Sequence, residues 1–180
     1  IYPVTDSDIH LDGGAVFGIV PRVLWEKAFP PDEKNRIPLS LHCLLIVTKK
    51  YKILIDTGLG TKHNEKFCRI YGINRRSSLL ESLHRFGYEP KDIDFVINTH
   101  LHFDHSGGNT FLNGTGKIVP TFPKAKYFVQ KGEIDAAVNS NERTRASYLA
   151  EDFLPLDDFK LLSVVHEETI EVDTGISLIK

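Results

Sequence analysis

The feature that most constrains the fold is an apolar segment that runs straight into a cluster of histidines. Residues 93–97 read Ile-Asp-Phe-Val-Ile, and residues 99–109 read Thr-His-Leu-His-Phe-Asp-His-Ser-Gly-Gly-Asn. A short run of β-branched and aromatic residues predicts a buried strand. In an extended loop beyond the strand, side chains alternate, so His100 and His102 point the same way. The strand therefore delivers both imidazoles to one edge of a sheet.

This histidine loop, residues 99–109, has the composition of a metal site. Imidazole and carboxylate groups are the ligands that zinc, iron and manganese prefer. Four such groups fall within six consecutive positions: His100, His102, Asp104 and His105. Asp104 and His105 fall on the following turn, where their donor atoms can aim at a second position nearby. The spacing predicts that one loop begins two adjacent metal sites, rather than a polar loop with chance histidines.

A further carboxylate, Asp56, closes another predicted strand. Residues 41–47 and 51–55 are apolar runs separated by a Lys-Lys turn, which predicts an antiparallel hairpin. The second strand ends in a glycine-rich loop of the kind that carries function on a rigid scaffold. Asp56 is open to two interpretations. It is a turn-forming residue, or it accepts a hydrogen bond from a metal-bound imidazole and fixes its tautomer.

The rest of the chain alternates between helices and strands. Ser78 and Glu81 form a capping-box pattern, which predicts a helix that stops at Gly87. Further strands are expected over 125–129, 161–165, 169–172 and from 175 onward, with a short helix over 133–138 and irregular helical turns between 139 and 156. This order predicts an α/β domain with mixed sheets.

Several other residues are better explained by structure than by chemistry. The remaining histidines lack ligand-type neighbours at useful spacing: His10, His42, His63, His84 and His166. Gly13-Gly14 followed by Phe17-Gly18 favours a hairpin turn. Trp25 and its Phe and Pro neighbours favour a satellite core rather than a substrate wall. The acidic pairs Glu151-Asp152 and Asp157-Asp158 are expected to be solvated.

Composition narrows the classes of function. The 180 residues are 41% hydrophobic and 26% charged, with a net charge of -2, which suits one globular domain without a nucleic-acid partner. No apolar run approaches a membrane span and no secretory pattern is visible, so we expect no membrane partner and a cytoplasmic location. Cys43 and Cys68 do not suggest a disulfide framework. Because the chain begins at Ile1 and contains no Met, we expect a trimmed or partial gene product.

The histidine loop resembles the HxHxDH signature of the metallo-β-lactamase superfamily. The Asp56-Thr57-Gly58 strand end and the Gly107-Gly108 pair also fit this family. The wording of the loop is closest to the N-acyl homoserine lactonase branch, for which SHLHFDHAGGN is typical, and residues 86–90 are also lactonase-like. The segment 13–18 resembles a loop that lies beside the metals in related hydrolases. The resemblance implies an αββα fold, with mixed β-sheets flanked by helices, over residues 1–180.

The same resemblance implies roles for the residues of the loop. His100 and His102 would bind one metal ion, and Asp104 and His105 a second. Zinc is the expected metal, with iron, manganese and cobalt as alternatives. The two ions would bridge a water, lower its pKa and polarise the bond under attack. Asp104 would also orient the hydroxide and return a proton to the leaving group. The implied activity is metal-dependent hydrolysis of a small-molecule lactone or related ester.

Two alternatives remain open at this stage. Relatives with the same loop cleave thioesters or phosphoesters, as glyoxalase-II-like and phosphodiesterase-like enzymes do. A non-catalytic metal-binding half-domain is the other. Family members place three further ligands, two histidines and a bridging aspartate, in the part of the fold that would follow Lys180. The resemblance thus implies an N-terminal part of the domain, with the missing ligands beyond Lys180 or on a partner, in a homo-oligomer or a complementing C-terminal half.

Overall fold

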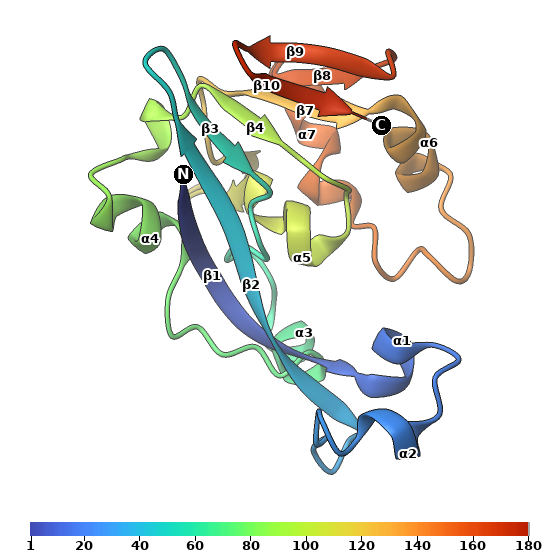
Figure 1. Ribbon diagram of the computed structural model, residues 1–180. Helices are drawn as coiled ribbons and strands as arrows, with labels where there is room; N and C mark the ends of the chain where they lie inside the picture. Colours follow the sequence, from blue (N-terminus) through green and yellow to red (C-terminus); the bar gives the residue numbers. More distant parts are fainter. Residues whose placement is uncertain (180) are drawn as a thin grey trace.

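The computed structural model describes residues 1–179, and its centre is a six-stranded mixed sheet (Figure 1). In spatial order the strands are β1 (Tyr2–Asp12), β2 (Arg36–Val47), β3 (Lys52–Ile55), β4 (Phe95–Ile97), β7 (Lys126–Gln130) and β8 (Leu162–Val165). The first three are antiparallel neighbours, whereas β3, β4, β7 and β8 run parallel. The predicted α/β class with mixed sheets is confirmed.

Short helices and two small hairpins surround this sheet. The helices are α1 (Gly13–Phe17), α2 (Arg22–Trp25), α3 (Glu65–Ile70), α4 (Leu79–Arg85), α5 (Phe103–Ser106), α6 (Lys131–Val138) and α7 (Leu154–Asp158), with 3-10 turns η1 (Pro90–Asp92), η2 (Gly107–Asn109) and η3 (Ala150–Asp152). The hairpins pair β5 (Thr110–Leu112) with β6 (Ile118–Pro120), and β9 (Thr169–Asp173) with β10 (Ile176–Ile179). Within residues 1–179 no helix has the length and apolar character needed to span a bilayer.

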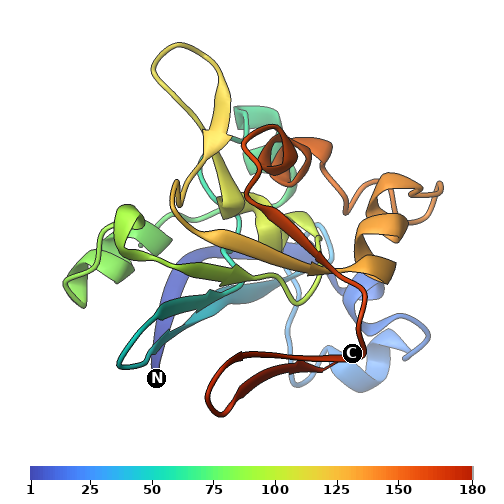
Figure 2. The same cartoon turned by 90° about the horizontal axis from the view of Figure 1, so that it is seen from above.

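The two faces of the large sheet are covered by different elements. On one face, Leu83 of α4 and Leu156 of α7 pack in the same core as Leu54. On the other face, Ile53 packs in a core with the apolar side chains of the β9–β10 hairpin, which lies across the sheet (Figure 2). Successive side chains of a strand point to opposite faces, so Ile53 and Leu54 serve different cores. Strand β3 is therefore buried on both sides, as its continuous apolar sequence predicts.

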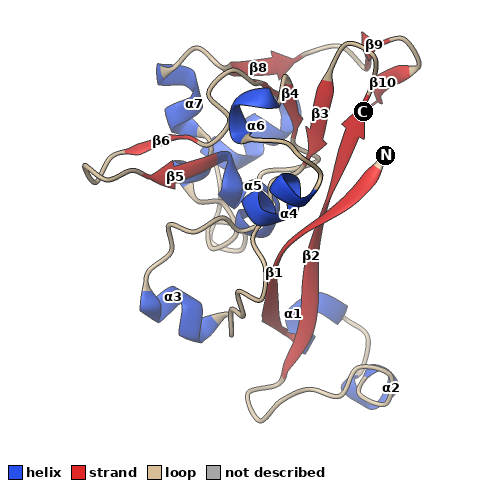
Figure 3. Ribbon diagram, turned by 90° about the vertical axis from the view of Figure 1, so that its left-hand side faces the viewer, coloured by secondary structure: helices blue, strands red, loops and turns tan. Residues whose placement is uncertain are grey.

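A long ribbon of β1 and β2 extends away from the body and carries α1 and α2 at its far end (Figure 3). The expected hairpin turn after Gly13 is wrong, because Asp12 caps a short helix by accepting a hydrogen bond from the Ala15 amide at 2.9 Å. The absence of a side chain at Gly13 lets the ring of Trp25 pack against the backbone there. Trp25 is 5% exposed and stacks on Phe17, which confirms the satellite core.

The segment from Ser78 to β4 determines where the histidine loop starts. The capping box is confirmed, with the Glu81 amide donating to Ser78 Oγ at 3.2 Å and the Ser78 amide donating to Glu81 Oε2 at 2.9 Å. Helix α4 then packs Leu79 and Leu83 on the sheet, and η1 leads into β4. Strand β4 lies between β3 and β7, so its carboxyl end opens at the middle of the sheet edge, where ligands bind in open α/β sheets.

Candidate metal centre

The structure brings the four predicted ligand side chains together at the carboxyl end of β4. His100 and His102 lie in the extended stretch after the strand, while Asp104 and His105 lie on α5. The ring centroid of His100 is 4.6 Å from that of His102 and 4.0 Å from that of His105. Asp104 Oδ2 is 3.7 Å from His105 Nε2. Three imidazoles and one carboxylate thus share one small, partly exposed region.

Residues between the ligands anchor the loop. Leu101 is fully buried in a core with Val129 and Phe153, and Phe103 packs beside Leu59. The four ligand-type side chains are only partly buried, so the loop alternates between anchoring and ligand positions. This alternation is the reason that the imidazoles are presented to solvent rather than absorbed into the core.

The donor set fits divalent first-row metals by its chemistry, since imidazole and carboxylate groups suit zinc, iron and manganese. Over residues 1–179, however, no three or more His, Cys, Asp or Glu side chains converge in the manner of a complete metal site. The residues that could hold an ion are therefore adjacent but incomplete as a coordination sphere.

Asp56 both forms the turn after β3 and contacts an imidazole of the histidine loop. Its backbone turns the chain after β3 with a φ of 56°, a left-handed conformation that Asp tolerates. Its carboxylate accepts hydrogen bonds from the Thr99 amide and hydroxyl, both at 2.8 Å, and lies 2.9 Å from His105 Nδ1. When Nδ1 donates to Asp56, Nε2 of His105 keeps its lone pair and is the ring atom that could bind a metal ion.

The histidines of the loop differ in electrostatic environment. Burial, reinforced by the positive charges that His105 and His102 would carry, lowers the pKa of His100 and favours the neutral imidazole, which is the form that binds metal. Burial would also lower the pKa of His105. The hydrogen bond that His105 donates to Asp56 and the negative charges of Asp56 and Asp104 outweigh that effect, and the pKa of His105 is raised.

Two residues near His102, Glu133 and Tyr148, contact the histidine loop and were not predicted from the sequence. Glu133, at the start of α6, accepts a hydrogen bond from the Leu101 amide at 2.8 Å. Tyr148 presents its ring to His102 edge to face, with centroids 4.8 Å apart. Both come from a region that reads as a short helix and a polar excursion, and nothing local in the sequence marks them. Their roles follow from the parallel pairing of β4 and β7, which places α6 beside the loop.

The segment after β3, residues 56–62, forms a backing for the histidine loop. The Thr57 amide donates to the carbonyl of His105 at 2.7 Å, and the Gly108 amide donates to that of Gly58 at 3.1 Å. The buried side chain of Asn109 accepts from Thr57 Oγ1 at 3.1 Å. A Cβ at Gly108 would lie 2.2 Å from the Thr57 carbonyl oxygen, so only glycine allows this approach. The glycine pair noted in the sequence is the signal for this contact.

Glu151 is exposed, as the sequence predicts, but the expectation of solvated charge is wrong for Asp152. Its side chain is 0% exposed, and its Oδ1 lies 2.7 Å from Nζ of Lys62, whose side chain is 2% exposed. The expectation failed because η3 packs against η2 at the end of the histidine loop, and because the partner, Lys62, is far away in the sequence. Neighbouring residues therefore give no hint of the burial of Asp152.

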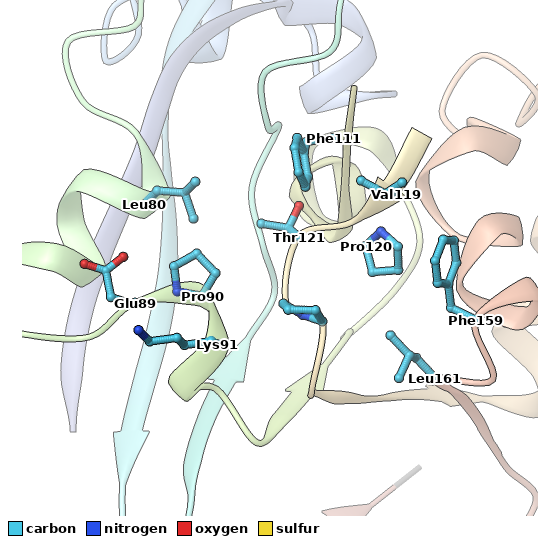
Figure 4. A pocket seen from close by; sticks show the side chains of 11 residues that line it. Leu80, Glu89, Pro90, Lys91, Phe111, Val119, Pro120, Thr121, Phe159 and Leu161 are labelled. Atoms are coloured by element: carbon cyan, nitrogen blue, oxygen red, sulfur yellow. The ribbon is translucent and has the colours of Figure 1, made fainter. Parts of the chain in front are cut away.

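Two cavities differ in their relation to the histidine loop. One of about 630 Å³ opens between the carboxyl ends of the parallel strands and β10, and its lining includes Thr99 and Glu133. The other, of about 530 Å³, is more apolar and lies between Leu80, Phe111 and Phe159 (Figure 4). None of the residues lining the second cavity belongs to the histidine loop or its backing. The first cavity adjoins the start of the histidine loop at Thr99, and none of the four ligand-type side chains is part of its lining.

Comparison with known proteins agrees with this arrangement. The family model described as the metallo-beta-lactamase superfamily matches residues 36–176. An N-acyl homoserine lactonase from Bacillus cereus is 30% identical over 155 residues, which cover 81% of this chain and 54% of that protein. The chain thus spans about half the length of the curated relatives that it matches.

Solved structures show the same fold. A probable metal-dependent hydrolase from Staphylococcus aureus is 34% identical with a TM-score of 0.86, covering 98% of this chain and 61% of that one. The dizinc quorum-quenching lactonase AidC, solved with a product, is 26% identical with a TM-score of 0.66, covering 91% and 57%. The αββα class expected from the histidine loop is confirmed, and the chain belongs to the metallo-β-lactamase superfamily.

Proposed function

We propose that this chain supplies the first four ligands of a dinuclear, metal-dependent hydrolase that opens lactones. The observation that carries the proposal is the contact of His100, His102, Asp104 and His105 at one sheet edge, with Asp56 bonded to His105. The similarity to N-acyl homoserine lactonases supports the substrate class. The rest of the coordination sphere is assigned to residues that this chain does not contain.

Each ligand has a stated role in this proposal. His100 and His102 hold one ion, and Asp104 and His105 hold the other, with zinc preferred because the similar lactonase AidC is dizinc. When bound, the two ions supply Lewis acidity toward a lactone carbonyl and make water acidic enough to react near neutral pH. Asp56 holds the proton on His105 Nδ1 and so keeps Nε2 as the ligand atom.

Asp104 is the residue proposed to handle the proton of the reaction. Its carboxylate is partly exposed, and its Oδ2 lies 3.7 Å from Nε2 of His105. It is therefore placed to hold a proton and return it to the alkoxide oxygen that leaves when the lactone ring opens. The adjacent cavity of about 630 Å³ has the apolar side chains Ile55, Phe128 and Leu178 in its lining, which suits an acyl chain.

The test is metal content and substrate choice measured on the intact protein. We expect two zinc ions per chain and a higher kcat/KM for N-hexanoyl homoserine lactone than for a thioester or a phosphodiester. Asp104→Asn should lower kcat for the lactone by about 100-fold or more. His84→Ala is the matched control, because His84 is an exposed histidine on α4, away from the loop.

Other outcomes would redirect the proposal. Faster turnover of the thioester or phosphodiester would contradict the lactone assignment and leave metal-dependent hydrolysis in place. Two bound ions without turnover of any of the three substrates would favour a metal-binding module. Absence of metal binding by the intact protein would contradict the proposal as a whole.

A further inference from the structure

Lys62 reaches from the backing segment to the underside of the histidine loop. Its Nζ donates to the carbonyl oxygen of Gly107 and, at 3.3 Å, to that of Thr110. The same atom lies 2.7 Å from Oδ1 of Asp152. Gly107 comes two residues after His105, so the ammonium contacts the backbone just where the ligand helix α5 ends.

Burying the charges of Lys62 and Asp152 carries a large desolvation cost. Both side chains are essentially buried, and the carboxylate oxygens of Asp152 accept no hydrogen bond of good geometry from the part of the chain that the structure describes. Burial raises the pKa of Asp152 to about 6, although the charge of Lys62 acts in the opposite direction. Buried ion pairs of this kind are often replaced by apolar residues with no loss of stability. Stability alone therefore does not account for Lys62 and Asp152.

An ammonium can do here what an apolar side chain cannot. It binds two carbonyl oxygens, of Gly107 and Thr110, and so sets the turn of the backbone that follows α5. The Thr110 hydroxyl donates to the Glu151 carbonyl at 2.7 Å, which ties the same turn to η3 and hence to Asp152. The donor atoms of Asp104 and His105 depend on the direction of this short helix.

The other two ligands are held differently. His100 and His102 flank Leu101, whose side chain is buried and whose amide donates to Glu133. Within residues 1–179, neither Lys62 nor Asp152 makes a side-chain hydrogen bond or ion pair with this stretch of the loop. The Ser106 hydroxyl joins the two halves of the loop by donating to the carbonyls of Leu101 and His102 at 3.1 Å, but the contacts that hold each half to the rest of the protein differ.

We propose that Lys62 and Asp152 form a buried positioning pair for the second metal ion, because they fix the α5 end of the histidine loop. This inference rests on the proposed function in one respect, the assignment of Asp104 and His105 as ligands. It goes beyond that function in assigning separate supports to the two ions. Neither residue of the pair touches the reacting atoms.

The experiment compares metal affinity with stability in two variants of the intact protein. Lys62→Met leaves the Asp152 carboxylate buried without its partner, so we expect it to unfold at lower urea concentration than the parent. Lys62→Met/Asp152→Leu removes both charges, and we expect its urea midpoint to return to that of the parent or above. In both variants the second zinc ion should bind about 10 to 100-fold more weakly, with the first unchanged.

Chelator competition gives the two affinities, and the visible spectrum of the cobalt-substituted protein reports the ligand geometry at the second site. Lys66→Met is the matched control, since Lys66 is an exposed lysine of the nearby α3, and it should change neither affinity nor spectrum. Because the two variants are read against the same parent, the comparison needs only one of them to fold.

The outcomes separate the two proposals. A stable double variant that binds both zinc ions with the affinities of the parent would overturn the positioning role and leave the proposed function standing. Weaker binding of both ions by the same factor would also overturn it, because the pair would then support the whole loop. A parent that binds no second ion would contradict the proposed function, and the positioning role with it.

Discussion

The ligand-type side chains of the histidine loop and the backing segment, residues 56–62, differ in burial and in how far apart in sequence their contacts lie. On the ligand side, partly exposed imidazoles lie within a few residues of one another in the sequence. On the backing side, residues 56–62 contribute buried contacts from far along the chain, with glycine backbone and an ion pair against the same loop. The chemistry of the site is thus local in sequence, whereas its placement depends on long-range packing.

The largest expected effect is on stability, and it comes from adding a methyl group between the histidine loop and residues 56–62. Gly107 has a φ of -56°, so alanine would fit its backbone, but a Cβ there would lie 2.2 Å from the carbonyl oxygen of Leu59. Because the obstacle is backbone, we expect Gly107→Ala to lower the free energy of unfolding by about 3 kcal/mol or more. Urea unfolding measures it. Gly114→Ala, in the open β5–β6 turn, is the control. Similar urea midpoints for the two variants would show that residues 56–62 can shift to accommodate the added methyl group.

The next effect concerns the pH dependence of stability through Asp152. In the folded protein its carboxyl has a pKa of about 6, against an ordinary value of 3.8, so the folded state binds more protons between these values. The free energy of unfolding therefore falls as pH rises through this window, by up to about 3 kcal/mol. Asp152→Asn cannot titrate, so relative to the parent it should gain stability from pH 4 to pH 7 by about that amount.

The measurement is urea unfolding of both proteins at several pH values across this range. His63 acts in the opposite sense, because burial lowers its pKa to about 4, so deprotonation on raising the pH stabilises the folded state. That contribution is present in both proteins and largely cancels in the difference between them. Parallel pH profiles for the parent and Asp152→Asn would rule out an ionisable, buried Asp152.

The smallest expected effect lies on the ligand side. Asp56→Asn keeps the shape of the side chain and tolerates the positive φ, but it removes the charge that orients His105. We expect zinc to bind about 10 to 100-fold more weakly, with little change in the urea midpoint. Asp94→Asn is the control, because Asp94 accepts from the Lys52 amide near the start of β4, away from the site. Equal losses in both variants would mean that Asp56 acts through the strand rather than through His105.

Patterns within a few residues predicted much of this molecule. The hairpin of β2 and β3 and the capped helix α4 were predictable because burial alternation and capping are local. Strand β1 gave no clear signal, since its alternation is interrupted by Asp6, a buried carboxylate that accepts from the Leu59 and Leu79 amides. The partners of Asp6 and Asp152 are distant in sequence, so no local pattern could reveal either burial.

The separation between the histidine loop and its backing also bears on when a metal ion can be captured. Asp56 is 49 positions from His105, and Lys62 is 45 from Gly107, so these contacts close long loops and belong to the slower part of folding. A newly made chain would offer freely rotating imidazoles with little preference among metals. We therefore expect metal uptake to follow folding, with the choice of ion made by the finished scaffold and not by the nascent chain.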